Sequence, residues 1–194
     1  MKELLDFIAE FDRSMARKMD VIAVGGTALT LLGKKASTKD IDFCFISRND
    51  RERFINAAEK IGYENKTNKL IGRGIEVDVY AEGYIFCVQL PEDYAKRAVK
   101  IKEMQKLTVY TLNPLDLVIT KAARFSDRDR EDINTILDGY EIDQSEFVER
   151  WIGTMRNSMV KDAKENLKLM LLLFEKRGRL DKKAAEEAEG WLNE

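Results

Sequence analysis

The stretch VIAVGGTALTLLGKKASTKDIDFCFI, residues 21–46, decides the fold. It begins with the apolar run Val21–Val24, which two glycines stop, as expected of a buried strand that ends in a tight turn. A short helical segment follows the glycines. Apolar residues then alternate with others, so that Ile41, Phe43 and Phe45 share one face of a second strand. The stretch therefore predicts a strand, a glycine turn, a helix and another strand.

Alternating and helical patterns continue on both sides of this stretch. We expect helices over residues 2–19, 27–32, 50–61 and 91–99, and strands over 75–79, 84–88 and 107–112. Later residues are helical in pattern, with Pro114 opening one helix and Asp143 capping another. The sequence predicts an α/β (α+β) core over residues 1–112, followed by a C-terminal helical bundle over residues 113–194.

The composition excludes several kinds of site. There are 33 basic and 35 acidic residues, and the net charge of −2 gives no overall case for nucleic-acid binding. The chain has no histidine, which excludes an imidazole general base, a Ser-His-Asp triad and the usual zinc ligands. Any metal must be bound by oxygens, and this favours Mg²⁺ or Mn²⁺.

The sequence also bears on the compartment. Its start lacks the pattern of a signal peptide, and its longest apolar run, Met170–Phe174, is too short to span a bilayer. Cys44 and Cys87 lie in apolar segments, where a reduced, buried thiol is expected. We therefore expect a cytoplasmic protein with no membrane partner.

Three acidic residues and two glycines form a pattern suited to phosphoryl transfer. Gly25 and Gly26 lie between a strand and a helix, where phosphate can approach the backbone. Asp40 and Asp42 are two residues apart on a predicted strand, and their carboxylates would point to one side. Asp78, on a later strand, would add a third carboxylate that holds metal or accepts a proton.

At these residues the chain resembles the DNA polymerase β-like nucleotidyltransferase superfamily. The resemblance rests on VIAVGGTAL at 21–29, STKDIDF at 37–43 and IEVDV at 75–79, in that order. Within the superfamily, the chain is most similar to a prokaryotic branch that includes the AbiE-type toxins. That branch has a lysine followed by Arg-Asp-x-x-Asp, matched here by Lys121 and by RDRED at 128–132. The likeness covers roughly residues 20–137.

The resemblance implies a small mixed β-sheet with flanking helices, a nucleoside triphosphate (NTP) substrate and Mg²⁺ or Mn²⁺ as cofactor. The implied catalytic residues and metal ligands are Asp40, Asp42 and Asp78. The implied nucleotide-binding residues are Gly25, Gly26, Ser37 and Lys121, and Thr27, Arg128 and Asp129 are further candidates.

Each motif also has a purely structural interpretation. Glycine turns serve steric needs, and half-exposed strands often alternate charged and apolar residues. Lys121 could reach solvent from its helix, and Asp129 and Asp132 could form salt bridges that join two helices. A basic cluster could bind RNA phosphates, but a solvated helix face is the commoner role of such clusters. Its members are Lys96, Arg97, Lys100, Lys102 and Lys106.

Three functions are compatible with these motifs. The first is nucleotidyl transfer from an NTP to a tRNA end, a protein side chain or a small hydroxylated metabolite. The second is the same chemistry in a toxin that is paired with an antitoxin protein. The third is a nucleotide-binding module without turnover, which gives no physical reason to keep like charges together.

Overall fold

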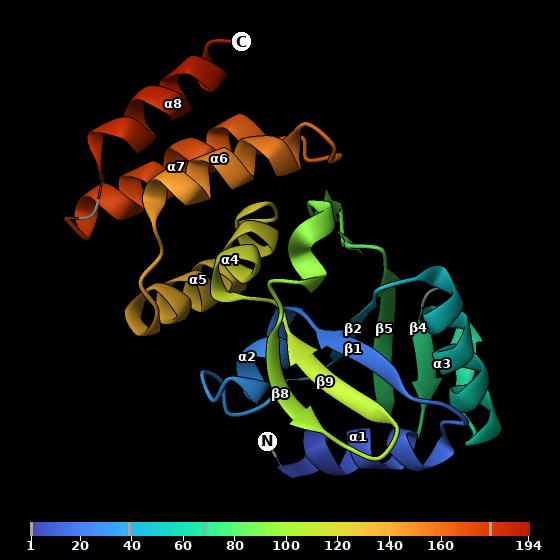
Figure 1. Ribbon diagram of the computed structural model, residues 1–194. Coiled ribbons are helices and arrows are strands. Elements are labelled where there is room, and N and C mark those ends of the chain that lie inside the picture. The colour runs from blue at the N-terminus through green and yellow to red at the C-terminus, as the bar shows by residue number, and fades with distance from the viewer. Residues whose placement is uncertain (1, 39, 68, 179) are drawn as a thin grey trace. The chain divides into compact units, whose positions relative to one another are not determined.

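The computed structural model describes residues 2–38, 40–67, 69–178 and 180–194. The chain forms two compact units, shown in Figure 1 with colours running from blue at the N-terminus to red at the C-terminus. Unit 1 comprises Met1–Ile85 and Glu92–Asn113, and unit 2 comprises Phe86–Pro91 and Pro114–Glu194. Each unit has its own apolar core.

Unit 1 contains a sheet, three α-helices and one 3₁₀ helix among its described residues. The helices are α1 (Lys2–Ser14), α2 (Gly25–Leu31), α3 (Arg48–Lys60) and the 3₁₀ helix η1 (Glu92–Ala95). The strands are β1 (Met19–Ala23), β2 (Ile41–Phe45), β3 (Glu64–Lys66), β4 (Lys69–Gly72), β5 (Ile75–Ala81), β6 (Tyr84–Ile85), β8 (Val99–Glu103) and β9 (Leu107–Thr111).

The sheet of unit 1 is mixed, with the strand order β3-β4-β5-β2-β1-β9-β8 and with β6 paired to β5. β2 runs parallel to β5, and β1 runs parallel to β9. The other neighbours along this path are antiparallel. The expected α/β class with a mixed sheet is therefore confirmed. β1 and β2 are antiparallel neighbours in the centre of the sheet. The end of β1 therefore lies beside the start of β2.

A cluster of aromatic rings determines which face of the sheet the helices cover. Phe54 of α3 stacks on Phe11 of α1, with ring centroids 4.7 Å apart. Phe54 also contacts Phe43 and Phe45 of β2, at centroid distances of 5.9 and 4.9 Å. Since alternate residues of a strand share a face, α1 and α3 pack on the face that carries these two rings. Asp42 is therefore on the opposite face.

The first helix is shorter than predicted. It was expected over residues 2–19, but α1 ends at Ser14. The Asp12 carboxylate accepts hydrogen bonds from the amides of Lys106 and Leu107, both at 2.7 Å, and this ties the helix end to the start of β9. Met19 already pairs with Leu107 in the sheet. The residues between Ser14 and Met19 must therefore leave the helix to enter β1.

The predicted helix over residues 91–99 is wrong beyond its first turn. The 3₁₀ helix η1 ends at Ala95, and β8 begins at Val99 as an edge strand paired with β9. The register shifts between Lys100 and Lys102, so the strand carries a bulge. Pairing with β9 overrides the local helical preference, because strand formation depends on the neighbouring strand more than on intrinsic propensity.

The predicted strand over residues 84–88 is divided between the two units. β6 ends at Ile85, and Phe86 has a φ of +56°, which is outside the strand region. β7 (Val88–Gln89) belongs to unit 2. There, the Met159 amide donates to the Cys87 carbonyl at 3.2 Å, and the Gln89 amide donates to Ser158 Oγ at 2.9 Å.

The remainder of unit 2 is helical. Its helices are α4 (Pro114–Ala122), α5 (Asp127–Gly139), α6 (Gln144–Met155), α7 (Ala163–Lys176) and α8 (Lys182–Leu192). The fully buried rings of Phe147, Trp151 and Phe174 form its aromatic core. The predicted cap at Asp143 is confirmed, because its side chain accepts a hydrogen bond from the Glu146 amide at 2.7 Å.

The cysteines and the lengths of the helices bear on the expected compartment. Cys44 and Cys87 are both free thiols, the first buried and the second partly buried. None of the helices in the four described ranges has the length and apolar character that a bilayer-spanning segment requires.

Replacing Phe54 by alanine should test the aromatic core of unit 1. The side chain is fully buried between α1 and β2, so Phe54→Ala should lower the free energy of unfolding by about 3–5 kcal/mol. Glu59→Ala, at an exposed position of the same helix, should change it by no more than about 0.5 kcal/mol. Urea unfolding followed by circular dichroism measures both, and equal losses in the two variants would contradict the proposed core.

Candidate active site

The glycine turn follows β1 and stays in contact with β2. The Val24 amide donates a hydrogen bond to the Asp42 carbonyl at 3.0 Å, which continues the pairing of the two strands. Gly25 comes next with a φ of +55°, in the left-handed region that glycine adopts without strain. α2 then starts at Gly25. The chain is thus redirected beside Asp42.

Neither glycine of the turn has space for a side chain. A Cβ atom on Gly25 would lie 2.7 Å from Asp42 Oδ2 and 3.3 Å from its Cγ. A Cβ atom on Gly26 would lie 2.7 Å from Oγ1 of Thr38. Both distances are shorter than carbon–oxygen van der Waals contact. The two glycines therefore let the turn backbone come directly against the Asp42 carboxylate and the Thr38 hydroxyl.

Two threonine hydroxyls fix the segment that carries Asp40 and Asp42. Thr27 Oγ1, on α2, accepts a hydrogen bond from the Asp42 amide at 2.9 Å and donates to the Asp40 carbonyl at 3.3 Å. Thr38 Oγ1 donates to the same Asp40 carbonyl at 2.8 Å. The backbone of this segment is therefore attached to the glycine turn and its helix. Thr27 therefore positions the backbone at both aspartates.

Asp40 and Asp42 differ in environment. The alternating pattern predicted both on one strand, but β2 begins at Ile41 and Asp40 occupies a bend just before it. Asp40 is exposed, whereas the exposed fraction of Asp42 is 8%. The close approach of the glycine turn explains the burial of Asp42, since Gly25 lies against its carboxylate. The Asp42 side chain is thus buried against the glycine turn, whereas the Asp40 side chain is open to solvent.

Asp78 is brought next to Asp42 by the strand register. β2 and β5 are parallel, with Asp42 paired to Asp78 and the apolar Phe43 paired to Val79. Paired residues of neighbouring strands point to the same face of the sheet. Partial burial raises the pKa of the Asp78 carboxyl, Lys69 opposes this rise, and the negative charges of Asp40 and Glu76 add to it. The pKa of Asp78 therefore depends on the charges of Asp40 and Glu76.

A lysine that the sequence did not indicate joins this group. Lys69 of β4 pairs with Asp78 of β5 in the antiparallel register. Its Nζ lies 2.7 Å from Glu76 Oε2 and 3.8 Å from Asp78 Oδ1. The hydrogen bond with Glu76, the attraction of Asp78 and a smaller contribution from Asp40 raise the pKa of Lys69. Lys69 is therefore a cation at neutral pH.

The donor set suits a hard divalent cation. Carboxylate oxygens, which Mg²⁺ and Mn²⁺ prefer, come from Asp40, Asp42 and Asp78. The backbone of the glycine turn lies beside the Asp42 carboxylate. In the described part of the chain, no group of three or more Cys, Asp or Glu residues is already arranged to hold a metal ion. The three carboxylates would therefore have to converge as they bind.

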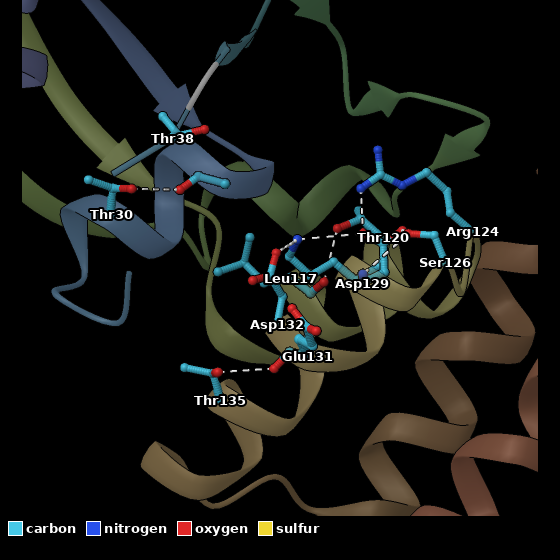
Figure 2. Close-up of polar contacts among 12 residues, drawn as sticks. Thr30, Thr38, Leu117, Thr120, Arg124, Ser126, Asp129, Glu131, Asp132 and Thr135 are labelled. Atoms are coloured by element: carbon cyan, nitrogen blue, oxygen red, sulfur yellow. Dashed lines mark hydrogen bonds and ion pairs between the residues drawn. The ribbon is translucent and has the colours of Figure 1, made fainter. Parts of the chain in front are cut away.

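Unit 2 contains a separate cluster of charges around Lys121. The exposed fraction of the Lys121 side chain is only 2%, and its Nζ lies 2.6 Å from Asp132 Oδ2 and 3.6 Å from Asp129 Oδ1. Figure 2 shows Asp129 also held by Arg124 and Ser126, at 2.6 and 2.7 Å. These contacts join α4 to α5. The structure thus shows the salt bridges that were considered for Asp129 and Asp132.

Some candidates have less specific surroundings. Ser37 and Arg128 are both exposed. Thr38, one residue after Ser37, has its hydroxyl against Gly26. The sequence indicated Ser37 and not Thr38, because motif spacing alone does not show which of two adjacent hydroxyls faces the glycine turn. Lys69 was missed because its pairing with Asp78 depends on a register that no motif specifies.

Comparison with known proteins identifies a family. The family model described as "Nucleotidyltransferase of unknown function (DUF6036)" matches residues 2–177. Among solved structures, the chain is similar to a Thermotoga maritima protein provisionally described as a nucleotidyltransferase. The identity is 13%, over 72% of this chain and 95% of that one, with a TM-score of 0.46. No curated protein matches this chain.

Gly25→Ala should separate the steric role of Gly25 from its backbone conformation. Gly33 has a similar positive φ of +70°, but a Cβ there would meet no described atom within 4 Å, so Gly33→Ala serves as the matched control. Both variants should lose about 1–2 kcal/mol from the left-handed backbone. Gly25→Ala should lose more, because its Cβ displaces the Asp42 carboxylate. Urea unfolding measures the difference, and equal losses would show that the contact with Asp42 is not constraining.

Lys121→Met should test the buried charges of unit 2. It removes the ammonium that lies 2.6 Å from Asp132 Oδ2, and breaking a buried ion pair from one side costs about 3–5 kcal/mol. Lys168→Met removes an exposed pair with Glu165 and should cost less than about 1 kcal/mol. The double variant Lys121→Met, Asp132→Leu should recover part of the loss in urea unfolding. A stability of Lys121→Met equal to that of the wild type would exclude this structural role.

Proposed function

We propose that this chain, which belongs to the family of nucleotidyltransferases of unknown function, transfers a nucleotidyl group from an NTP to an acceptor. The contact that carries the proposal is the one between Gly25 and Asp42. It places the backbone of the glycine turn directly beside the Asp42 carboxylate, and Asp42 pairs with Asp78 on the neighbouring strand. Phosphoryl transfer requires this combination, because the phosphates must be held close to acidic metal ligands.

Asp40, Asp42 and Asp78 are the proposed metal ligands, for Mg²⁺ or Mn²⁺. A divalent ion bound there would neutralise charge on the phosphate oxygens. Asp42 supplies the fixed ligand, since Thr27 and the glycine turn hold its segment. Asp40, at the exposed side, and Asp78, on the neighbouring strand, would complete the ligand set. Asp78 is also the proposed acceptor of the proton of the attacking hydroxyl.

The phosphates are proposed to bind at the backbone of Gly25 and Gly26. Their lack of side chains lets an anion approach the amides. Thr38, whose hydroxyl lies against Gly26, is the better placed of the two candidate hydroxyls, and Ser37 is its exposed neighbour. Thr27 acts indirectly, by holding the backbone at Asp40 and Asp42.

Contact of Lys121 with the triphosphate stays a prediction. Its ammonium is bound to Asp132 and Asp129 within unit 2, and reaching a phosphate would require it to leave both carboxylates. Arg128 is exposed one residue before Asp129 and is the more accessible cation of that motif. We therefore propose that Lys121 positions α4 against α5, and that Arg128 is available to a ligand.

The acceptor is proposed to carry a hydroxyl, as a tRNA end, a protein side chain or a small metabolite would. The likeness to the AbiE-type branch raises the alternative of a toxin paired with an antitoxin protein, using the same chemistry. That alternative predicts that growth stops when the chain is expressed and that Asp42→Ala restores it. Normal growth on expression of an active enzyme would remove it.

Transfer activity should depend on the two motif aspartates. The wild-type chain incubated with labelled NTPs, Mg²⁺, total tRNA and cell extract should leave label on one acceptor fraction. Asp40→Ala and Asp42→Ala should lower the rate by on the order of 10²-fold or more, because each removes a metal ligand. Asp6→Ala, which removes an exposed carboxylate of α1, is the matched control.

Two results would contradict the proposal. The first is NTP binding that needs no metal and is equal in wild type, Asp40→Ala and Asp42→Ala, as measured by isothermal titration. The second is tight, metal-dependent NTP binding without transfer to any acceptor fraction. That second result would favour a binding module of the same fold.

A further inference from the structure

A row of three charged residues crosses three neighbouring strands. Asp42 of β2 pairs with Asp78 of β5, and Asp78 pairs with Lys69 of β4. Paired residues share a sheet face and lie about 5 Å apart. The proposed metal site therefore has a lysine at one end of its row of paired residues.

The Lys69 ammonium lies between two carboxylates and is closer to one of them. It lies 2.7 Å from Glu76 Oε2, at hydrogen-bond distance, and 3.8 Å from Asp78 Oδ1, at ion-pair distance. Glu76 is two residues before Asp78 on β5, so both carboxylates are on the same face of that strand. The lysine side chain is 37% exposed and therefore has room to move. A small rotation of its long side chain would exchange one carboxylate partner for the other.

The charges around this lysine favour a shared cation. Asp40 and Glu76 both add to the negative potential at Asp78, and Lys69 is the cation that opposes it. A divalent ion at Asp78 would meet the Lys69 ammonium as a like charge only a few ångströms away. Two cations cannot both occupy that carboxylate without repulsion.

We propose that Lys69 is a positioning residue that acts as a tethered counter-ion: held by Glu76, it also neutralises Asp78 at ion-pair distance when no divalent ion is bound, and it withdraws fully to Glu76 when one binds. The inference rests on the proposed function, because it takes Asp78 as a metal ligand. Glu76 has its own part in the exchange: it holds the withdrawn ammonium. The acidic group is thereby neutralised in the empty site, and metal binding is a competition with Lys69.

Binding of Mn²⁺ alone to the full chain, measured by isothermal titration, tests the exchange. Lys69→Met should bind Mn²⁺ roughly three- to tenfold more tightly than the wild type, given a partly solvent-screened charge. Lys100→Met is the matched control. Lys100 is on β8, at the other end of the strand order, and forms an exposed ion pair with Glu103. Its removal should change the affinity less than twofold, and thermal melts should show all variants folded.

The role of Glu76 gives a sharper test. Glu76→Gln should weaken Mn²⁺ binding in the wild type, because Lys69 loses the partner that holds it away from Asp78. The same substitution made on Lys69→Met should change the affinity less than twofold. Equal weakening in both backgrounds would mean that Glu76 acts only through its charge, and would overturn the exchange. Unchanged or weaker binding by Lys69→Met would overturn it as well.

Failure of the metal site itself gives a different pattern. If Asp42→Asn binds Mn²⁺ as well as the wild type, or if neither the wild type nor Lys69→Met binds it, the proposed function fails and this inference fails with it. If binding requires Asp42 and is insensitive to Lys69, the metal site stands and only the exchange is wrong.

Discussion

The contact between the Gly25 backbone and the Asp42 carboxylate is the constraint on which the rest of unit 1 depends. It exists because β1 and β2 are antiparallel and central, so the end of one strand meets the start of the other. It requires glycine twice over, for the positive φ and for the missing Cβ. Hydroxyl contacts from Thr27 then fix the backbone of the acidic segment against α2.

Much of the sheet could be predicted from the sequence, because burial leaves a periodic signal. The alternation of Ile41, Phe43 and Phe45 predicted one apolar face of β2, and the aromatic contacts with Phe54 are on that face. The strand β8 could not be predicted in this way. It lies at the sheet edge, where Val99 is exposed and Ile101 is only half-buried, so its short alternation of apolar residues and lysines marks no buried face. Its identity as a strand comes from β9.

The candidate site could be predicted in part, for a similar reason. Motif spacing indicated Gly25, Asp42 and Asp78. A tight turn calls for glycine, and a metal site for a hard cation calls for carboxylates. Their adjacency depends on the parallel pairing of β2 with β5, which lies outside what local pattern specifies. The sequence also did not predict the burial of Lys121, because a lysine on an amphipathic helix usually reaches solvent. Its burial depends on Asp129 and Asp132 of the next helix.

The cost of the acidic group itself argues that the group has a use. On β5, Val77 and Val79 show that this strand readily carries apolar residues, yet Glu76 and Asp78 place two carboxylates on its other face. Partial burial is the main effect that raises the pKa of Asp78, the charges of Asp40 and Glu76 add to it, and Lys69 opposes it. A face selected for stability alone would avoid such crowding, because like charges that are partly withdrawn from water repel strongly. Carboxylates held together against their own repulsion create a strong attraction for a cation, and the backbone of the glycine turn lies directly beside one of them, Asp42.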